Sequence, residues 1–169
     1  MSLTANLSPW QILAVAVRSE EDAALFYMEL QTRVKNPILI DKLKFLAGEE
    51  RKHKAILERL FGQKYPDRPK EVPPGVDRLK IKASLDGGAD VPALFRAALQ
   101  AEVEAESYYA EAAAGTEAAD ARQVLNYLSR VERSHQAMIT AELDLIEKFP
   151  DYYNVEDFHI AQDLFHVGP

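Results

Sequence analysis

The sequence predicts an all-α protein, a four-helix bundle made of two antiparallel helical hairpins. Three observations lead to this fold class. Four long segments carry apolar residues at helical spacing, a stretch rich in proline and glycine divides them into two pairs, and the second pair repeats the first. At 169 residues the chain has the length of one domain, so we expect residues 1–169 to form a single bundle.

The first hairpin is predicted over residues 9–35 and 37–61. Ser8 is placed as the N-cap of its first helix, with Gln11 three residues later completing a capping box. Asn36, which is followed by proline, breaks the chain and starts the second helix. A glycine follows residue 61, so we expect that helix to end there.

The second hairpin follows a long connection. Residues 63–90 hold four prolines and three glycines, too many for a long regular element, and we interpret them as a crossover. Helices are then predicted over residues 91–114, after Asp90 as N-cap, and over residues 117–149, before a proline. Short links within each pair and a long link between the pairs are typical of a bundle of two hairpins.

The two hairpins repeat each other at a constant offset of 82 residues, without insertions. The matched pairs are Ser8 and Asp90, Glu20 and Glu102, Ala23 and Ala105, Tyr27 and Tyr109, Leu46 and Leu128, Glu50 and Glu132, and His53 and His135. An offset that holds over both helices indicates a duplicated hairpin.

Each predicted helix has one inward stripe of apolar residues, and each stripe contains a glutamate near its middle. The second and fourth stripes also contain a histidine three residues after the glutamate. The six polar residues are Glu20, Glu50, His53, Glu102, Glu132 and His135. Residues three apart face the same side of a helix, so each Glu-x-x-His pair presents an oxygen and a nitrogen together.

Four carboxylates at one buried centre repel each other or bind protons unless cations neutralise them. No lysine or arginine lies on the stripes, and without cysteine only His, Asp and Glu remain as strong metal ligands. Two divalent ions balance four carboxylates, and each ion can take one imidazole. We therefore predict a two-metal site. Tyr27 and Tyr109, two turns from a glutamate on the same stripes, either hydrogen-bond a ligand carboxylate or serve only as core aromatics.

The tail, residues 150–169, shows how weak a single Glu-x-x-His pair is. Glu156 and His159 have the same spacing but no matching glutamate on another helix, so we expect His159 and His166 to lie at the surface or in packing. Helical spacing nevertheless predicts a short amphipathic segment docked on the bundle, through Val155, Phe158, Gln162 and Phe165.

Charge and hydropathy narrow the possible partners and location. A net charge of −7 with no basic stripe argues against nucleic-acid binding. No stretch approaches the roughly 20 apolar residues that a membrane span needs, and the first residues lack a basic start and a cleavage site. We therefore expect a cytoplasmic protein that does not contact membranes.

The six polar residues, together with Ala23, Tyr27, Ala105 and Tyr109, resemble the two-metal carboxylate motif of the ferritin-like superfamily, and most closely its rubrerythrin branch. The resemblance covers about residues 8 to 148. It implies two iron ions bridged by Glu50 and Glu132, with Glu20 and Glu102 as terminal carboxylates and one histidine on each ion. It also implies redox chemistry with hydrogen peroxide or dioxygen, a catalytic role for these six residues, and a place in the oxidative-stress response.

The chain departs from the rubrerythrin pattern at two places. Rubrerythrins usually carry a cysteine-ligated iron domain as an electron relay, and this chain has no cysteine, so an external electron donor is expected. Rubrerythrins also tend to have a further glutamate one turn after the single one on the third helix, where this chain has Ala105. Glu106 is the neighbouring candidate to replace it.

Two alternatives stay open at this point. The first is an iron-handling protein, a ferroxidase or storage protein that does not turn over peroxide. The second is a structural bundle filled with zinc, which accepts the same mixed ligands without redox activity; manganese is a further candidate metal. The long crossover allows hairpins to be exchanged between subunits, which makes a homodimer our expectation.

Overall fold

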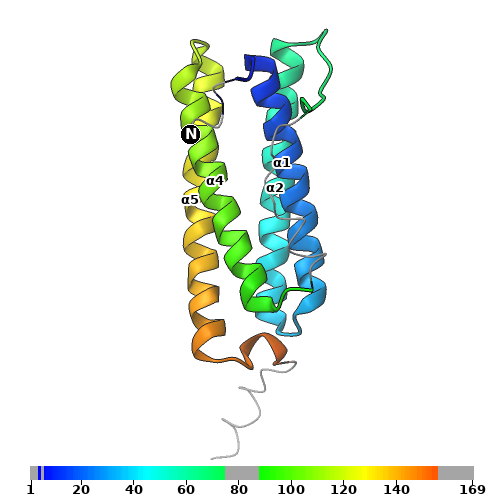
Figure 1. The fold of residues 1–169 in the computed structure, drawn as a ribbon, viewed down its shortest axis with the longest axis vertical. Helices are drawn as coiled ribbons and strands as arrows, with labels where there is room; N and C mark the ends of the chain where they lie inside the picture. The colour runs from blue at the N-terminus through cyan, green and yellow to red at the C-terminus, as the bar shows by residue number, and fades with distance from the viewer. Residues whose placement is uncertain (1–3, 5, 75–87, 156–169) are drawn as a thin grey trace, which may run out of the picture.

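Four α-helices run along a common long axis, and the predicted bundle of two hairpins is confirmed (Figure 1). The computed structural model describes residue 4, residues 6–74 and residues 88–155. The first hairpin consists of α1 (Pro9–Leu30) and α2 (Pro37–Lys64), and the second of α4 (Val91–Gly115) and α5 (Ala119–Lys148). Two short 3-10 turns, η1 (Gln31–Arg33) and η2 (Tyr152–Asn154), complete the described elements, none of which is a strand.

The chain direction explains the long connection between the hairpins. In Figure 1, α2 ends at one end of the bundle, whereas α4 begins at the opposite end, where α2 also begins. The chain between them therefore has to return along the whole bundle. Part of the predicted crossover, residues 75–87, lies outside the described residues.

Three helix ends differ from the sequence prediction by two or more residues. The α-helical part of α1 stops at Leu30 instead of residue 35, because the chain tightens into η1 and Val34 is extended. Helix α2 continues past Gly62 to Lys64, since that glycine keeps a negative φ and does not form a left-handed cap. Helix α5 begins at Ala119, two residues later than predicted.

Asn36 holds together the corner at which the first hairpin turns. This fully buried side chain accepts hydrogen bonds from the backbone N–H groups of Ile38 and Leu39, which caps α2. Its amide also donates to the carbonyl of Tyr152 at 2.8 Å, and its backbone N–H donates to the carbonyl of Tyr153 at 3.2 Å. The start of the tail is thus fixed to the first hairpin. The tail residues Glu156, His159 and His166 lie outside the described residues.

The apolar core has two parts with a polar layer between them. One part contains buried residues such as Phe26, Leu46 and Phe95, and the other contains residues such as Leu57 and Leu128. Burying one leucine side chain stabilises the fold by roughly 1.5–3 kcal/mol. The two apolar parts of the core therefore account for most of the stabilisation by apolar burial. Among the described residues, no helix combines the length and apolarity needed to cross a bilayer.

Candidate metal centre

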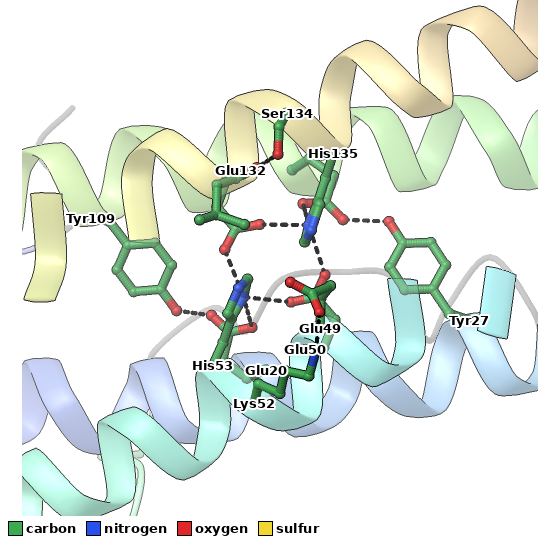
Figure 2. Close-up of polar contacts among 12 residues, drawn as sticks. Glu20, Tyr27, Glu49, Glu50, Lys52, His53, Tyr109, Glu132, Ser134 and His135 are labelled. Atoms are coloured by element: carbon green, nitrogen blue, oxygen red, sulfur yellow. Dashed lines mark hydrogen bonds and ion pairs between the residues drawn. The ribbon is translucent and has the colours of Figure 1, made fainter. Parts of the chain in front are cut away.

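All six polar residues of the predicted stripes meet in this polar layer. Figure 2 labels all of them except Glu102. Helix α1 contributes Glu20, α2 contributes Glu50 and His53, α4 contributes Glu102, and α5 contributes Glu132 and His135. Each of them is no more than 4% exposed. The heptad-like spacing that buries the leucines of each stripe also turns these polar side chains inward.

Each imidazole lies among three carboxylates. His53 Nδ1 is 3.1 Å from Glu50 Oε2, 3.2 Å from Glu132 Oε1 and 3.6 Å from Glu20 Oε2. His135 Nδ1 is 3.0 Å from Glu50 Oε1, 3.3 Å from Glu132 Oε2 and 3.4 Å from Glu102 Oε2. The two rings are stacked, with centroids 5.5 Å apart and an interplanar angle of 18°.

These spacings match the separations of ligands around a metal ion. Donor atoms about 2.1 Å from one ion are about 3.0 Å apart at right angles and about 3.4 Å apart at the tetrahedral angle. The donor atoms form two groups within 4.8 Å: one with Glu20 and His53, the other with Glu102 and His135. Glu50 and Glu132 belong to both groups, so two ions in these positions would share two carboxylates.

Several donor atoms in the cluster have no hydrogen-bond partner. Glu50 Oε1, Glu132 Oε1, His53 Nε2 and His135 Nδ1 are buried and unsatisfied among the described residues. His135 Nδ1 is close to three carboxylates, but none of these contacts has hydrogen-bond geometry. Buried polar atoms are rarely left unpaired, and here the unpaired atoms are strong metal ligands, two of which, Glu50 Oε1 and His135 Nδ1, lie 3.0 Å apart. The residues present therefore fit a pair of bound cations.

The protonation of the cluster follows from burial and from the neighbouring charges. Burial raises the pKa of Glu20 and of Glu102 well above the usual value, and the charge of Glu50 raises both further. Burial also acts to raise the pKa of Glu50 and Glu132, but the close contacts with the two imidazoles outweigh it and both values are lowered. The charged form is thus favoured for Glu50 and Glu132, the inner carboxylates, and the protonated form is favoured for Glu20 and Glu102, the outer carboxyls.

The imidazoles respond in the opposite sense. Burial acts to lower the pKa of both histidines, yet the close contacts with the surrounding carboxylates more than reverse this effect. The pKa of His53 is raised, and that of His135 rises to about 12. Two imidazolium ions then balance the two inner carboxylates, so protons keep the metal-free cluster close to neutral. Binding two divalent ions requires these protons to leave.

Two buried tyrosines bracket the cluster, as Figure 2 shows. The hydroxyl of Tyr27 on α1 donates to Glu102 Oε1 on α4, and the hydroxyl of Tyr109 on α4 donates to Glu20 Oε1 on α1. Burial raises the pKa of both phenols, and the nearby carboxylates raise it further, so both remain hydrogen-bond donors. Each hairpin therefore orients the outer glutamate of the other hairpin.

The comparison with known proteins agrees with this geometry. The sequence profile of the rubrerythrin family matches residues 11–143, which include the whole cluster. The chain belongs to the rubrerythrin family. Its structure is also similar to that of a hypothetical protein from Pyrococcus furiosus, with 27% sequence identity and a TM-score of 0.74, over 86% of this chain and 94% of that one. No curated protein matches the chain.

This rubrerythrin-family chain differs from the sequence expectation at two acidic residues near the cluster. Glu106 does not replace the missing glutamate, because its carboxylate accepts hydrogen bonds from Arg133 and Gln136 outside the cluster. Glu49, which lies outside the predicted stripes, has a carboxylate oxygen within 4.8 Å of ring nitrogens of both histidines. The position of Glu49 one turn before His53 is the sequence signal that could have identified it.

Proposed function

We propose that this rubrerythrin-family protein binds two iron ions and uses them to reduce hydrogen peroxide or to react with dioxygen. The observation that supports this is the sharing of Glu50 and Glu132 between the two donor groups, since shared carboxylates hold two ions close enough to act on one small molecule. The family match supports metal binding. We take iron as the metal because the ligands combine carboxylates with one imidazole per ion.

Two ferrous ions would supply the two electrons that, with two protons, convert one hydrogen peroxide into two waters, each ion becoming ferric. In this proposal Glu20, Glu50 and His53 hold one ion with Glu132, and Glu102, Glu132 and His135 hold the other with Glu50. The six residues are then the catalytic residues as well as the ligands. Burial between two apolar core regions excludes bulk water from the cluster and strengthens its electrostatic interactions.

The proposal also includes partners. The chain contains no cysteine, so the electrons that restore the ferrous state have to come from a donor outside these 169 residues. We further propose a homodimer and a role in oxidative stress, on the basis of the long crossover and of the peroxide chemistry. A cytoplasmic location fits a reduced iron site that needs a cellular donor.

A single-turnover experiment tests the function. The protein is loaded anaerobically with two ferrous ions per chain and mixed with hydrogen peroxide, and the ferric absorption is followed by stopped flow. We expect rapid oxidation in the native protein and in Glu106→Gln, whose carboxylate lies outside the cluster. Glu102→Gln, on the same helix but inside the cluster, should oxidise at least about 10-fold more slowly or lose one ion.

Three results would contradict the proposal in different ways. If peroxide does not oxidise the ferrous protein, the redox function is wrong. Much more than two irons per chain in a large assembly would indicate iron storage. Retention of zinc in preference to iron, after isolation from iron-replete cells, would indicate a structural site.

A further inference from the structure

Each histidine of the cluster has a second ring nitrogen that also needs a partner. Both rings place Nδ1 within 3.6 Å of three cluster carboxylates, so Nδ1 is the nitrogen that faces the metal positions. An imidazole that binds a metal ion through Nδ1 carries its proton on Nε2. His53 Nε2 is buried and has no hydrogen-bond partner among the described residues. A metal-bound His53 therefore needs an acceptor at this nitrogen.

Glu49 on α2 brings a carboxylate to the histidines from outside the cluster. One of its oxygens lies within 4.8 Å of a ring nitrogen of His53 and of a ring nitrogen of His135. One water molecule with two hydrogen bonds spans such a gap. The side chain of Glu49 is 18% exposed, whereas those of both histidines are almost completely buried. Glu49 thus lies between the buried rings and the solvent.

Lys52 fixes one oxygen of this carboxylate. Its ammonium group donates to Glu49 Oε1 at 2.6 Å, and the lysine side chain itself is mostly exposed (Figure 2). Within the part of the chain that the structure describes, this ion pair leaves Glu49 Oε2 available as an acceptor. The pair therefore presents one oxygen to solvent-exposed Lys52 while the other can serve the histidines.

The internal repeat of the chain is broken at this pair. At the offset of 82 residues, Glu49 matches Val131 and Lys52 matches Ser134. Valine offers no acceptor, and Ser134 donates its hydroxyl to the carbonyl of Val131 at 2.6 Å. All six predicted ligands have a counterpart at this offset, whereas Glu49 has none. The carboxylate outside the cluster is thus supplied by the first hairpin alone.

We propose that Glu49 is a positioning residue, which accepts a hydrogen bond from Nε2–H of His53, directly or through one water molecule, and so holds Nδ1 toward the metal. The inference rests on the two-ion site of the proposed function and adds a residue to it. A carboxylate behind a ligating histidine fixes the tautomer and the orientation of the ring and makes the imidazole a stronger ligand. Since the second hairpin lacks this carboxylate, the two ions are held unequally.

Metal affinity tests this role without any oxidant. Cobalt(II), whose visible absorption reports on its ligands, is titrated into the protein in competition with a chelator. Glu49→Ala should bind one of the two ions about 10-fold to 100-fold more weakly, the usual cost of removing such a partner. Glu49→Gln should bind that ion more tightly than Glu49→Ala does, because the amide oxygen still accepts a hydrogen bond.

The ring protons give a readout that a purely structural role would not change. In the NMR spectrum of the cobalt-loaded protein, the N–H protons of ligated imidazoles give strongly shifted signals that disappear by exchange with water. In Glu49→Ala, one of these signals should exchange at least about 10-fold faster than in the native protein, because the bond that protects the proton is removed.

Asp41→Ala is the matched control. Asp41 also lies on α2 and pairs with a lysine three residues later, Lys44, at 3.0 Å, but it is not part of the cluster. This variant should keep the native cobalt affinity and proton exchange. Equal cobalt affinity in Glu49→Ala and Asp41→Ala would overturn the inference and leave the two-ion site intact. Equal losses in Glu49→Ala and Glu49→Gln would also overturn it, because the lost charge would then explain both. Failure of the native protein to bind two ions would instead contradict the proposed function.

Discussion

Tyr27 and Tyr109 each hydrogen-bond a glutamate of the opposite hairpin. Their contribution to metal binding can be measured apart from their contribution to folding. Tyr27 donates to Glu102 and Tyr109 donates to Glu20, each from the opposite hairpin. Tyr27→Phe and Tyr109→Phe each remove one hydroxyl and keep the ring, so the core packing is preserved. We expect both variants to bind metal more weakly than the native protein.

The magnitude follows from the protonation of the outer carboxyls. In the metal-free protein the raised pKa values favour the protonated form of these carboxyls, and a hydrogen bond to a neutral carboxyl is worth about 1 kcal/mol. With metal bound the same group is an ionised carboxylate, and the lost bond is worth about 1.5–3 kcal/mol. The difference of about 0.5–2 kcal/mol corresponds to about 2-fold to 30-fold weaker binding of one ion.

The chain offers a control of the same chemistry. Tyr108 donates its hydroxyl to the backbone carbonyl of Ile12 at 2.8 Å and does not contact the cluster. Tyr108→Phe should lower the free energy of unfolding by about 1 kcal/mol in urea, like the other two, without changing metal affinity in a chelator competition. The reasoning fails if Tyr27→Phe and Tyr108→Phe have the same metal affinity.

Three further outcomes are expected. Metal affinity should rise as pH increases and fall in acid, because metal binding expels protons from both imidazoles and both outer carboxyls. Metal titrations at a series of pH values, with a proton-release indicator, measure the affinity and the number of protons released. Replacing Glu50 and Glu132 together with leucine should abolish binding of both ions in elemental analysis, yet change metal-free stability by less than about 2 kcal/mol. Without these two carboxylates, which raise the pKa of both histidines, the imidazoles can lose their protons and leave no unpaired charge in the core. Asn36→Ala should cost about 2 kcal/mol in urea unfolding, since it removes a helix cap and leaves buried backbone groups without a partner; a loss below about 0.5 kcal/mol would contradict this account.

The inward stripes could be read from the sequence because spacing alone decides which face of a helix is buried. Residues at steps of three and four, such as Leu46, Glu50 and His53, share one face wherever the helix lies. The internal repeat then indicated that four such faces meet, and the structure brings the six polar residues together as expected. Helix ends were less predictable, since Gly62 is compatible with either a cap or a continuing helix.

Contacts between the hairpins could not be read from the sequence. Tyr27 lies on the same stripe as Glu20, but its hydroxyl reaches Glu102, because the partner depends on how the two hairpins face each other. Glu142 was missed for a similar reason. It is a buried carboxylate held by Lys42 on α2 and by Tyr152 beyond α5, and neither partner is near it in the sequence.

The cluster also explains how such a site can be folded before metal arrives. Four buried carboxylates would oppose folding if all were charged, but the raised pKa values of the outer carboxyls and of the imidazoles keep protons in the places that cations later take. Metal-free folding then leaves no large unbalanced charge in the core, and each bound ion adds to stability by mass action, by about 2.7 kcal/mol when free metal is 100 times the dissociation constant. Protons and metal ions compete for the same ligand atoms. A substitution that lowers metal affinity without changing the stability of the metal-free protein therefore acts on the metal-loaded state alone. The tyrosine hydroxyls stabilise the metal-free and the metal-loaded protein by different amounts. The change in metal affinity on substitution to phenylalanine measures this difference.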